Sequence, residues 1–246
     1  MSVLRSLAIA AGLLILWQAV VSLADLPAYI LPGPARVGAV LLAQPGLIAA
    51  NAAVTALEIV LGLVLGLLLG ASAALVLTFS PVLRRWLLPV LVASQAIPVF
   101  ALAPMLVLWL GYGLASKVAM ATLIIFFPVT AAFHDGLRRT EPAWLDLAGI
   151  MGADRLSVLW HLRLPAALPA LASGLRVAAA VAPIGAVVGE WVGSSAGLGH
   201  LMLNANARLQ IDLMFAALLV LAAFALLLYA LVDRVGRALT PWLREG

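Results

Sequence analysis

AAVTALEIVLGLVLGLLLGASAALVLT, residues 52–78, is a long apolar run whose single charged residue is Glu58. A helix rises about 1.5 Å per residue, so roughly 20 apolar residues cross the hydrocarbon core of a bilayer. The run lacks the alternation of apolar and polar residues that a lipid-facing β-strand shows. The stretch therefore predicts a transmembrane α-helix and decides the fold class.

The composition extends this prediction to the whole chain. Of 246 residues, 65% are hydrophobic and 10% are charged, and the mean hydropathy is +1.19. A soluble domain is about half apolar and about one quarter charged. No soluble core of this size could hide so much apolar surface, so the surrounding solvent is lipid. We expect an all-α polytopic membrane protein with about six transmembrane helices.

The expected spans lie at about 6–24, 52–78, 86–110, 115–133, 168–190 and 213–232. Neither an internal repeat nor a low-complexity linker divides the chain, so residues 1–246 are expected to form a single transmembrane domain. The first span has a second interpretation. Arg5, an apolar stretch and Ser22-Leu23-Ala24 also fit a cleavable signal peptide. We favour a retained first helix, because polytopic membrane proteins usually keep it as an anchor.

Lysine and arginine set the expected orientation. With the N-terminus inside, the cytoplasmic side holds eleven of the 14 basic residues: Arg5, Arg84, Arg85, Arg138, Arg139, Arg155, Arg163, Arg176, Arg234, Arg237 and Arg244. The outer side holds Arg36, Lys117 and Arg208. The bias predicts a multi-pass protein with a cytoplasmic N-terminus. The net charge of +4 and pI near 10.3 do not indicate a nucleic-acid partner, because the basic residues are dispersed beside apolar runs.

Two connections on the outer side differ in expected structure. In residues 25–50, the stretch VGAVLLA is expected to form a short interfacial helix after a proline-rich segment. Residues 193–212, GSSAGLGHLMLNANARLQID, are expected to be an outer loop.

Small and polar residues interrupt the second span. Gly62, Gly66 and Gly70 recur every four residues, which places them on one helix face and favours close helix packing. Glu58 continues this face toward the outer end. Because an intramembrane carboxylate is costly, Glu58 is expected to face protein or water, as a packing group, a pore-side group or a proton relay.

Prolines mark a candidate translocation path in the third span. Pro89, Pro98 and Pro104 interrupt it, with Gln95 between them. Broken helices often line such paths, although a packing kink explains the prolines equally well. We take Gln95, Pro98 and Glu190, at the outer end of the fifth span, as candidate path residues.

The cytoplasmic segment 134–167 is unusually rich in charged and aromatic residues. Thr140 and Pro142 predict a helix start, and Gly152 is expected to end that helix near 151. Asp154 then caps a second helix at about 155–162, which Pro165 ends. A solvated loop has no need of Trp144, Met151 and Trp160, so part of this surface is expected to dock on a soluble partner.

This segment resembles the EAA loop of ABC importer permeases, whose pattern is EAA-x3-G-x9-I-x-LP. Asp146-Leu147-Ala148 stands for EAA, Gly152 follows after three residues, and Leu164-Pro165 closes the pattern. Leu147 departs from it, in the place of the second alanine. In such families this coupling loop, here about 140–165, sits in a cleft of an ATP-hydrolysing subunit. The resemblance assigns coupling to Asp146, Ala148, Gly152, Ala153, Leu164 and Pro165.

Three further blocks carry the resemblance over most of the chain. AIPVFALAPMLVLWLGYGLASK (96–117), GEWVGSSAGLGHLM (189–202) and LPGPARV (31–37) resemble permeases for nitrate, sulfonates, taurine and thiamine pyrimidine precursors. The resemblance implies a bacterial inner (plasma) membrane permease that works as a homodimer in lipid. Its partners would be an ATP-binding cassette ATPase and a periplasmic or lipid-anchored substrate-binding protein.

The same resemblance bears on cofactors and substrate. It implies that ATP and Mg are bound by the partner ATPase, and that this chain holds no cofactor. The sequence agrees, because it has no G-x-x-x-x-G-K-[ST] motif around its only lysine, Lys117. Residues 189–218 look most like permeases for hydroxymethylpyrimidine, a thiamine precursor; a sulfonate, taurine or nitrate importer is the alternative.

Two other classes of protein remain as rivals. An ion-gradient-driven secondary transporter would use Glu58 or Glu190 as its titrating group and need no ATPase. It usually shows an inverted repeat, which this sequence lacks. A membrane enzyme is disfavoured, because no catalytic cluster and no metal-ligand pattern is visible around His134, His161 or His200. We therefore expect a transport subunit rather than an enzyme.

Overall fold

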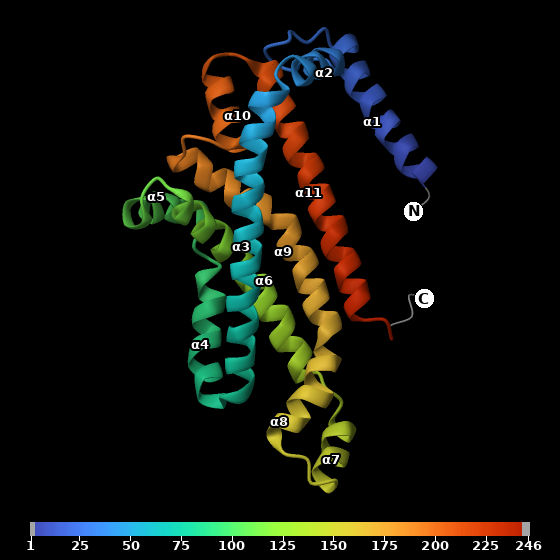
Figure 1. Ribbon diagram of the computed structural model, residues 1–246, viewed down its shortest axis with the longest axis vertical. Helices are drawn as coiled ribbons and strands as arrows, with labels where there is room; N and C mark the ends of the chain where they lie inside the picture. Colours follow the sequence, from blue (N-terminus) through green and yellow to red (C-terminus); the bar gives the residue numbers. More distant parts are fainter. Residues whose placement is uncertain (1–2, 243–246) are drawn as a thin grey trace.

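The computed structural model describes residues 3–242, and it describes side chains for residue 5 and residues 8–242. Every regular element in this part of the chain is a helix (Figure 1), which confirms the all-α prediction. The elements are α1 Val3–Leu23, α2 Pro34–Ala43, α3 Pro45–Phe79, α4 Pro81–Ser94, α5 Val99–Leu110, α6 Leu114–Arg138, α7 Pro142–Ile150, α8 Arg155–Val158, the π-helical segment η1 Leu159–Arg163, α9 Leu164–Gly193, α10 Leu198–Ala207 and α11 Ile211–Leu239.

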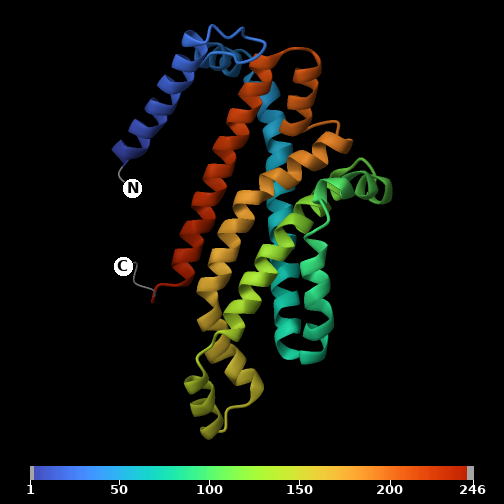
Figure 2. The same ribbon diagram turned by 180° about the vertical axis from the view of Figure 1, so that it is seen from behind.

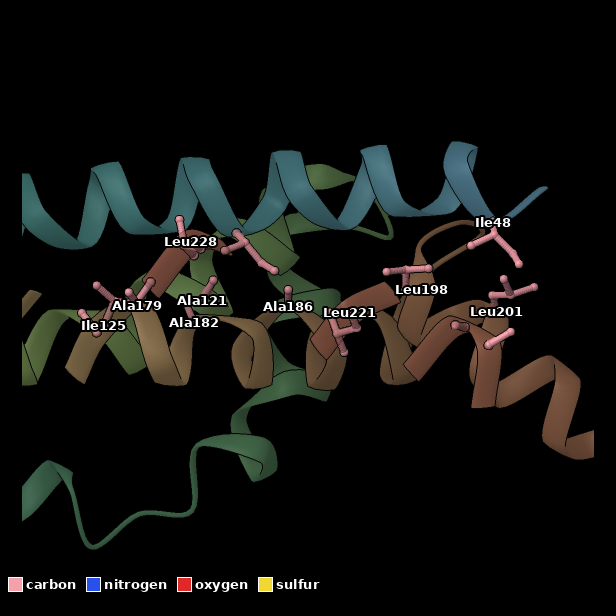
Figure 3. Close-up of a cluster of buried hydrophobic side chains, with 14 of the residues drawn as sticks. Ile48, Ala121, Ile125, Ala179, Ala182, Ala186, Leu198, Leu201, Leu221 and Leu228 are labelled. Carbon is pink, nitrogen blue, oxygen red and sulfur yellow. The ribbon is translucent and has the colours of Figure 1, made fainter. Parts of the chain in front are cut away.

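Four of these elements form the centre of the molecule. Helices α3, α6, α9 and α11 run along the long axis and pack beside one another in both views (Figures 1 and 2). Small side chains let their backbones approach closely, which is how helices associate in lipid. Figure 3 shows this in the core, where Ala179, Ala182 and Ala186 of α9 lie near Ala121 of α6.

The glycine stripe of the second span faces this centre. A Cβ atom on Gly62 would lie 2.5 Å from the Ala121 Cβ, and one on Gly70 would lie 2.9 Å from the Val129 Cγ1. A Cβ atom on Gly66, which lies between these two glycines in α3, would likewise collide with the Ile125 side chain. The glycines thus allow α3 to lie directly against α6, which confirms the prediction that the stripe is a packing face.

Five of the six expected spans correspond to single helices, although their boundaries shift. In the described chain, α3, α6, α11 and the run Arg155–Gly193 are long and apolar enough to cross a membrane. Helix α3 begins at Pro45 rather than near 52, because proline suits the first turn of a helix. The first expected span corresponds to α1, most of whose described side chains are exposed. Trp17 of α1 contacts Phe215 of α11, with ring centroids 6.1 Å apart.

The third expected span, in which the sequence placed three interrupting prolines, is broken in the structure. Helices α4 and α5 meet at a bend of 100°, across a break of a few residues, so this region is a broken span or a re-entrant loop. Proline disfavours helical geometry in the residue before it and cannot donate a backbone hydrogen bond. Pro98 has an extended backbone, with φ −59° and ψ 113°, whereas Pro89 and Pro104 lie inside helices.

The outer connections contain more helix than expected. Helix α2 confirms the short helix around VGAVLLA. Residues 193–212 are not simply a loop, because α10 lies within them. Its buried Leu198, Leu201 and Ala205 follow helical spacing, a signal that the sequence already contained.

The cytoplasmic segment contains the two expected helices, with different ends. Helix α7 begins after Glu141, and the Thr140 hydroxyl instead donates to the Leu137 carbonyl at 3.3 Å, so Thr140 does not cap α7. Pro165 does not end the second helix either. The Leu164 N–H donates to the Leu159 carbonyl five residues back, and this π-helical turn connects α8 to α9 without a break.

Candidate functional site

The coupling loop is built around a left-handed turn. Gly152 has φ +75°, its N–H donates to the Gly149 carbonyl at 3.0 Å, and the Ala153 N–H donates to the Ala148 carbonyl at 2.9 Å. This pair of bonds is the Schellman arrangement, in which the residue after the helix adopts positive φ and is usually glycine. The spacing that carried the family resemblance is therefore also the spacing that ends α7.

Asp154 starts the second helix of the loop, as the sequence predicts. Its Oδ1 accepts a hydrogen bond from the Ser157 N–H at 3.0 Å. The hydrogen bonds from Ser157 lower the pKa of the Asp154 carboxyl below its ordinary value of 3.8, because they stabilise the charged form. Asp154 is consequently ionised at neutral pH and holds the start of α8.

Helices α7 and α8 lie below the bundle (Figures 1 and 2). Together with the start of η1, they present an exposed apolar surface. Ile150 is 85% exposed and Met151 is 77% exposed, although neither carries a polar group. The other large exposed side chains of this surface are Trp144, Leu147, Leu156 and Trp160. Such a concentration of apolar side chains outside the expected bilayer is typical of a protein docking surface.

The six residues assigned to coupling occupy different layers of this loop. Asp146, Gly152 and Ala153 are exposed, whereas Ala148 is only 8% exposed and supports α7 from inside. Leu164 and Pro165 are half-buried at the start of α9. Leu147, the departure from the family pattern, is exposed on the docking surface, so its larger side chain meets no obstacle within the described chain.

The three candidate path residues do not form one cluster. Gln95 and Pro98 are exposed at the break between α4 and α5. Glu190 is 1% exposed, inside the outer half of the bundle. Its hydrogen bonds connect it to α3 and α10 rather than to the break between α4 and α5.

Glu190 belongs to α9, and its side chain contacts the N-terminus of α10. One carboxylate oxygen accepts a hydrogen bond from the Thr55 hydroxyl at 2.6 Å, and the other accepts from the Gly199 N–H and, at 3.1 Å, from the His200 N–H. The Thr55 hydroxyl oxygen in turn accepts from the Leu198 N–H at 2.7 Å. Helix N-termini favour negative charge because their first N–H groups lack partners within the helix. Glu190 therefore joins α3, α9 and α10 at one point.

Two further ionisable side chains are buried beside this point. Glu58 of α3 is 1% exposed, and no hydrogen-bond partner of its Oε2 is found in the described chain. Lys117 is 3% exposed rather than located in an outer loop, and its Nζ donates to the carbonyls of Tyr112 and Gly113. The sequence missed the burial of Lys117, because a lysine beside a glycine-rich turn usually reaches solvent.

A polar cavity of about 380 Å³ opens at the outer end, between α3 and α10. His200 and Asn204 line it, and the Asn204 amide contacts the His200 Nε2 at 2.7 Å. Its other lining residues include Gln44, Asn51, Arg208 and Gln210. These amide, imidazole and guanidinium groups offer hydrogen bonds and one positive charge, with no carboxylate among the lining residues. Among the described residues, no group of three His, Asp or Glu side chains is placed to hold a metal ion.

Comparisons with known proteins identify the family of this chain. The family model described as "Binding-protein-dependent transport system inner membrane component" matches residues 62–245. A Haemophilus influenzae protein named "Probable ABC transporter permease protein" is 58% identical over 230 residues, covering 94% of each chain. The riboflavin transport system permease protein RibX of Chloroflexus aurantiacus is 40% identical, covering 94% of this chain and 87% of that one. The formylaminopyrimidine transport permease protein ThiX of Halalkalibacterium halodurans is 35% identical, covering 95% and 93%.

A solved structure supports the fold. The permease chain in an inward-facing structure of the MetNI methionine ABC transporter superposes with a TM-score of 0.70 at 20% identity, covering 80% of this chain and 99% of that chain. The family match and the relatives above, rather than this fold likeness, decide the assignment. The chain therefore belongs to the binding-protein-dependent transport system inner-membrane components and is the multi-pass permease subunit of an ABC importer.

Proposed function

We propose that two copies of this chain form the path of an importer whose ATP and Mg are bound by a separate ATPase subunit. The observation that carries the proposal is the exposed apolar surface of α7 and α8, held in shape by the turn at Gly152. Asp146, Ala148, Gly152, Ala153, Leu164 and Pro165 form or support this surface. ATP-driven closure of the ATPase subunits would move the surface, and the helices would alternate between outward and inward access.

The arrangement of the helices supports a cytoplasmic N-terminus. Arginines gather at the end that carries α7 and α8, and the positive-inside bias places that end in the cytoplasm. The start of α1 points from α2 toward the same end (Figure 1). The outer end, with α2 and α10, then faces the substrate-binding protein that this family of importers requires.

The break between α4 and α5 supports a path shared by two copies. Gln95 is polar and exposed in a chain whose exposed surface is otherwise largely apolar. A polar group at membrane depth is costly against lipid and is expected to face protein or water. We propose that Gln95 and Pro98 face the path between the copies. Glu190 acts at the outer end of that path, through the position of α10, while lipid covers the remaining apolar faces.

We propose a planar nitrogen heterocycle as the substrate class, with a thiamine pyrimidine precursor as the first candidate. Relatives named for formylaminopyrimidine and riboflavin transport support this class, because both compounds contain a planar nitrogen-containing ring system. The polar outer cavity also supports it, because amide and imidazole groups pair with ring nitrogens and exocyclic amines. Taurine is the competing substrate, since the taurine transport system permease protein TauC of Escherichia coli is 31% identical.

Purification tests the proposed assembly. The chain, solubilised in mild detergent from its native host, is expected to carry a subunit with a P-loop motif. Reconstituted vesicles are expected to take up solute only when this subunit, MgATP and the binding protein are all present. Uptake by the purified chain alone, driven by an ion gradient, would overturn the proposal and favour the secondary-transporter alternative.

Calorimetry of the binding protein tests the substrate class. We expect micromolar or tighter binding of hydroxymethylpyrimidine or formylaminopyrimidine, and no measurable heat with taurine, because the selectivity of such systems resides largely in this protein. Riboflavin binding in place of the pyrimidines would keep the heterocycle class and change the substrate. Taurine binding alone would show that the heterocycle assignment is wrong.

A further inference from the structure

Helix α10 packs against α11, α9 and α3, and side chains of α3 and α9 hold its first turn through hydrogen bonds. Three consecutive N–H groups, those of Leu198, Gly199 and His200, donate to Thr55 or Glu190. The Gly197 N–H adds a bond of 2.8 Å to the Asn51 side-chain oxygen. This set of bonds leaves none of the first N–H groups of α10 to be satisfied by water.

The glycines of this turn are required by the approach of the carboxylate. Gly197 has φ +112°, and a Cβ atom there would collide with the Glu190 carboxylate. A Cβ atom on Gly199 would lie 2.8 Å from the Glu190 Oε2. In the stretch GEWVGSSAGLG, residues 189–199, Gly197 and Gly199 therefore leave the space that the Glu190 carboxylate occupies.

The bond to Glu190 is strong because it is buried and charge-assisted. The carboxylate is 1% exposed and accepts three donors, two of which belong to a helix N-terminus. Hydrogen bonds to a charged group are roughly twice as strong as neutral ones, and burial reduces competition from water. Helix α10 is therefore expected to follow any movement of the outer end of α9.

The opposite end of α9 leads without interruption to the coupling loop. Helix α8, the π-helical η1 and α9 form one apolar helical run from Arg155 to Gly193. Figure 1 shows this run passing from the lower end of the molecule to a point beside α10. One continuous element thus connects the surface proposed to meet the ATPase with the helix at the outer mouth.

We infer that Glu190 is a positioning residue that fixes α10 to α9, so that movement of the coupling loop displaces α10 at the outer mouth. The inference rests on the proposed function, because it requires an ATPase acting on α7 and α8. Glu190 then serves transport through α10 and need not touch the solute. The polar cavity between α3 and α10 changes shape with each displacement, since His200 and Asn204 are carried by α10.

Site-directed labelling of the complete transporter tests this inference. The chain contains no cysteine, so a single reporter cysteine is the only thiol that this subunit contributes to the transporter. The same complex without a reporter cysteine gives the background labelling of the partner subunits. Leu203→Cys reports on α10, where Leu203 is 45% exposed, and Ala143→Cys reports on the exposed face of α7. Thiol labelling rates are compared with and without MgATP and vanadate. We expect both reporters to change rate by at least about threefold in the otherwise native transporter, a difference that corresponds to a modest population shift.

Variants of the contact then separate the two reporters. Glu190→Gln keeps the shape of the side chain but removes its charge and one acceptor oxygen, so it cannot accept from both the Thr55 hydroxyl and the N–H groups of α10. Thr55→Val removes the hydroxyl that connects Glu190 to Leu198, and Thr55→Ser retains it as the matched control. We expect Leu203→Cys to lose its nucleotide response in Glu190→Gln and to lose at least half of it in Thr55→Val. In Thr55→Ser the nucleotide response of Leu203→Cys is expected to be retained. The labelling rate of Ala143→Cys is expected to change with nucleotide in every variant.

The outcomes distinguish the inference from the function on which it rests. A full nucleotide response of Leu203→Cys in Glu190→Gln and Thr55→Val overturns the inference, even if uptake falls. If Glu190→Gln does not accumulate, the two Thr55 variants decide the question by the same criterion. If the labelling rate of Ala143→Cys does not change with MgATP, the proposed coupling itself is refuted. A responsive Ala143→Cys with a silent Leu203→Cys in the native background refutes the connection to α10 alone.

Discussion

Replacing Gly152 by valine is expected to reduce ATP-driven uptake by about tenfold or more, while the amount of permease in the membrane changes little. Gly152 has φ +75°, a left-handed conformation that costs an L-residue about 1–2 kcal/mol and a β-branched residue more. The valine variant would relieve this strain by changing the turn between α7 and α8. The docking surface would then lose its shape, although no atom of the described chain lies within 4 Å of a Cβ at Gly152. Uptake into vesicles, with membrane levels measured by immunoblot, checks this expectation.

Gly152→Asn separates the backbone from the size of the side chain. Asparagine tolerates positive φ, but it adds a side chain that projects toward the proposed ATPase. If backbone strain dominates, Gly152→Asn retains much more uptake than Gly152→Val. If the proposed ATPase subunit leaves room only for a small residue at position 152, both variants lose uptake equally. Normal uptake by both variants would contradict the role of this turn in coupling.

Replacing Gly66 by valine is expected to prevent stable folding. The added side chain would enter the volume that the Ile125 side chain of α6 already occupies, and α3 and α6 form one of the most extensive helix contacts in the molecule. Overpacking a rigid core typically costs about 1–3 kcal/mol and occasionally more. We place this position at the high end, because separating the two helices also opens the contact of α6 with α9. Thermal stability of the detergent-purified permease, followed by size-exclusion chromatography, checks this expectation.

The neighbouring Gly62 offers a compensated test of the same contact. Gly62→Ala places a Cβ 2.5 Å from the Ala121 Cβ, and Ala121→Gly removes the atom that it strikes. The double variant is therefore expected to be more stable than Gly62→Ala alone, with a coupling energy of about 0.5–3 kcal/mol. Gly38→Ala is the matched control, because nothing lies within 4 Å of its Cβ. Equal loss in the single and double variants would show that the α3–α6 contact does not set the effect.

Family membership favours ATP-driven import over the ion-gradient alternative that the buried glutamates raised. The structure also offers another explanation for one of them. Glu190 is held by three donors as part of a helix contact, which accounts for a carboxylate in the membrane domain without a transport ion. Glu58 lies beside Glu190 in the same buried region, and no hydrogen-bond partner of its Oε2 is found in the described chain.

Local sequence signals predicted the start of α7 at Pro142, the turn at Gly152 and the cap of α8 at Asp154, but not the N-cap at Thr140. Pro142, Gly152 and Asp154 act through their own backbone geometry or through groups within a few residues, so their roles follow from the sequence. Pro165 misled the prediction. Its missing N–H is usually enough to end a helix, but here a π-helical turn precedes it and carries the chain into α9.

By itself, the sequence determined that this is a helical membrane protein, where its long apolar segments lie, and where the chain turns between α7 and α8. Hydropathy and backbone preference are properties of neighbouring residues, and lipid requires every spanning segment to satisfy its own hydrogen bonds. Only the tertiary structure decided that Glu190 holds α10, that Lys117 is buried, and that α4 and α5 meet at 100°. Thr55 and Glu190 are separated by 135 positions, and contacts over such distances depend on how the helices pack rather than on any local pattern.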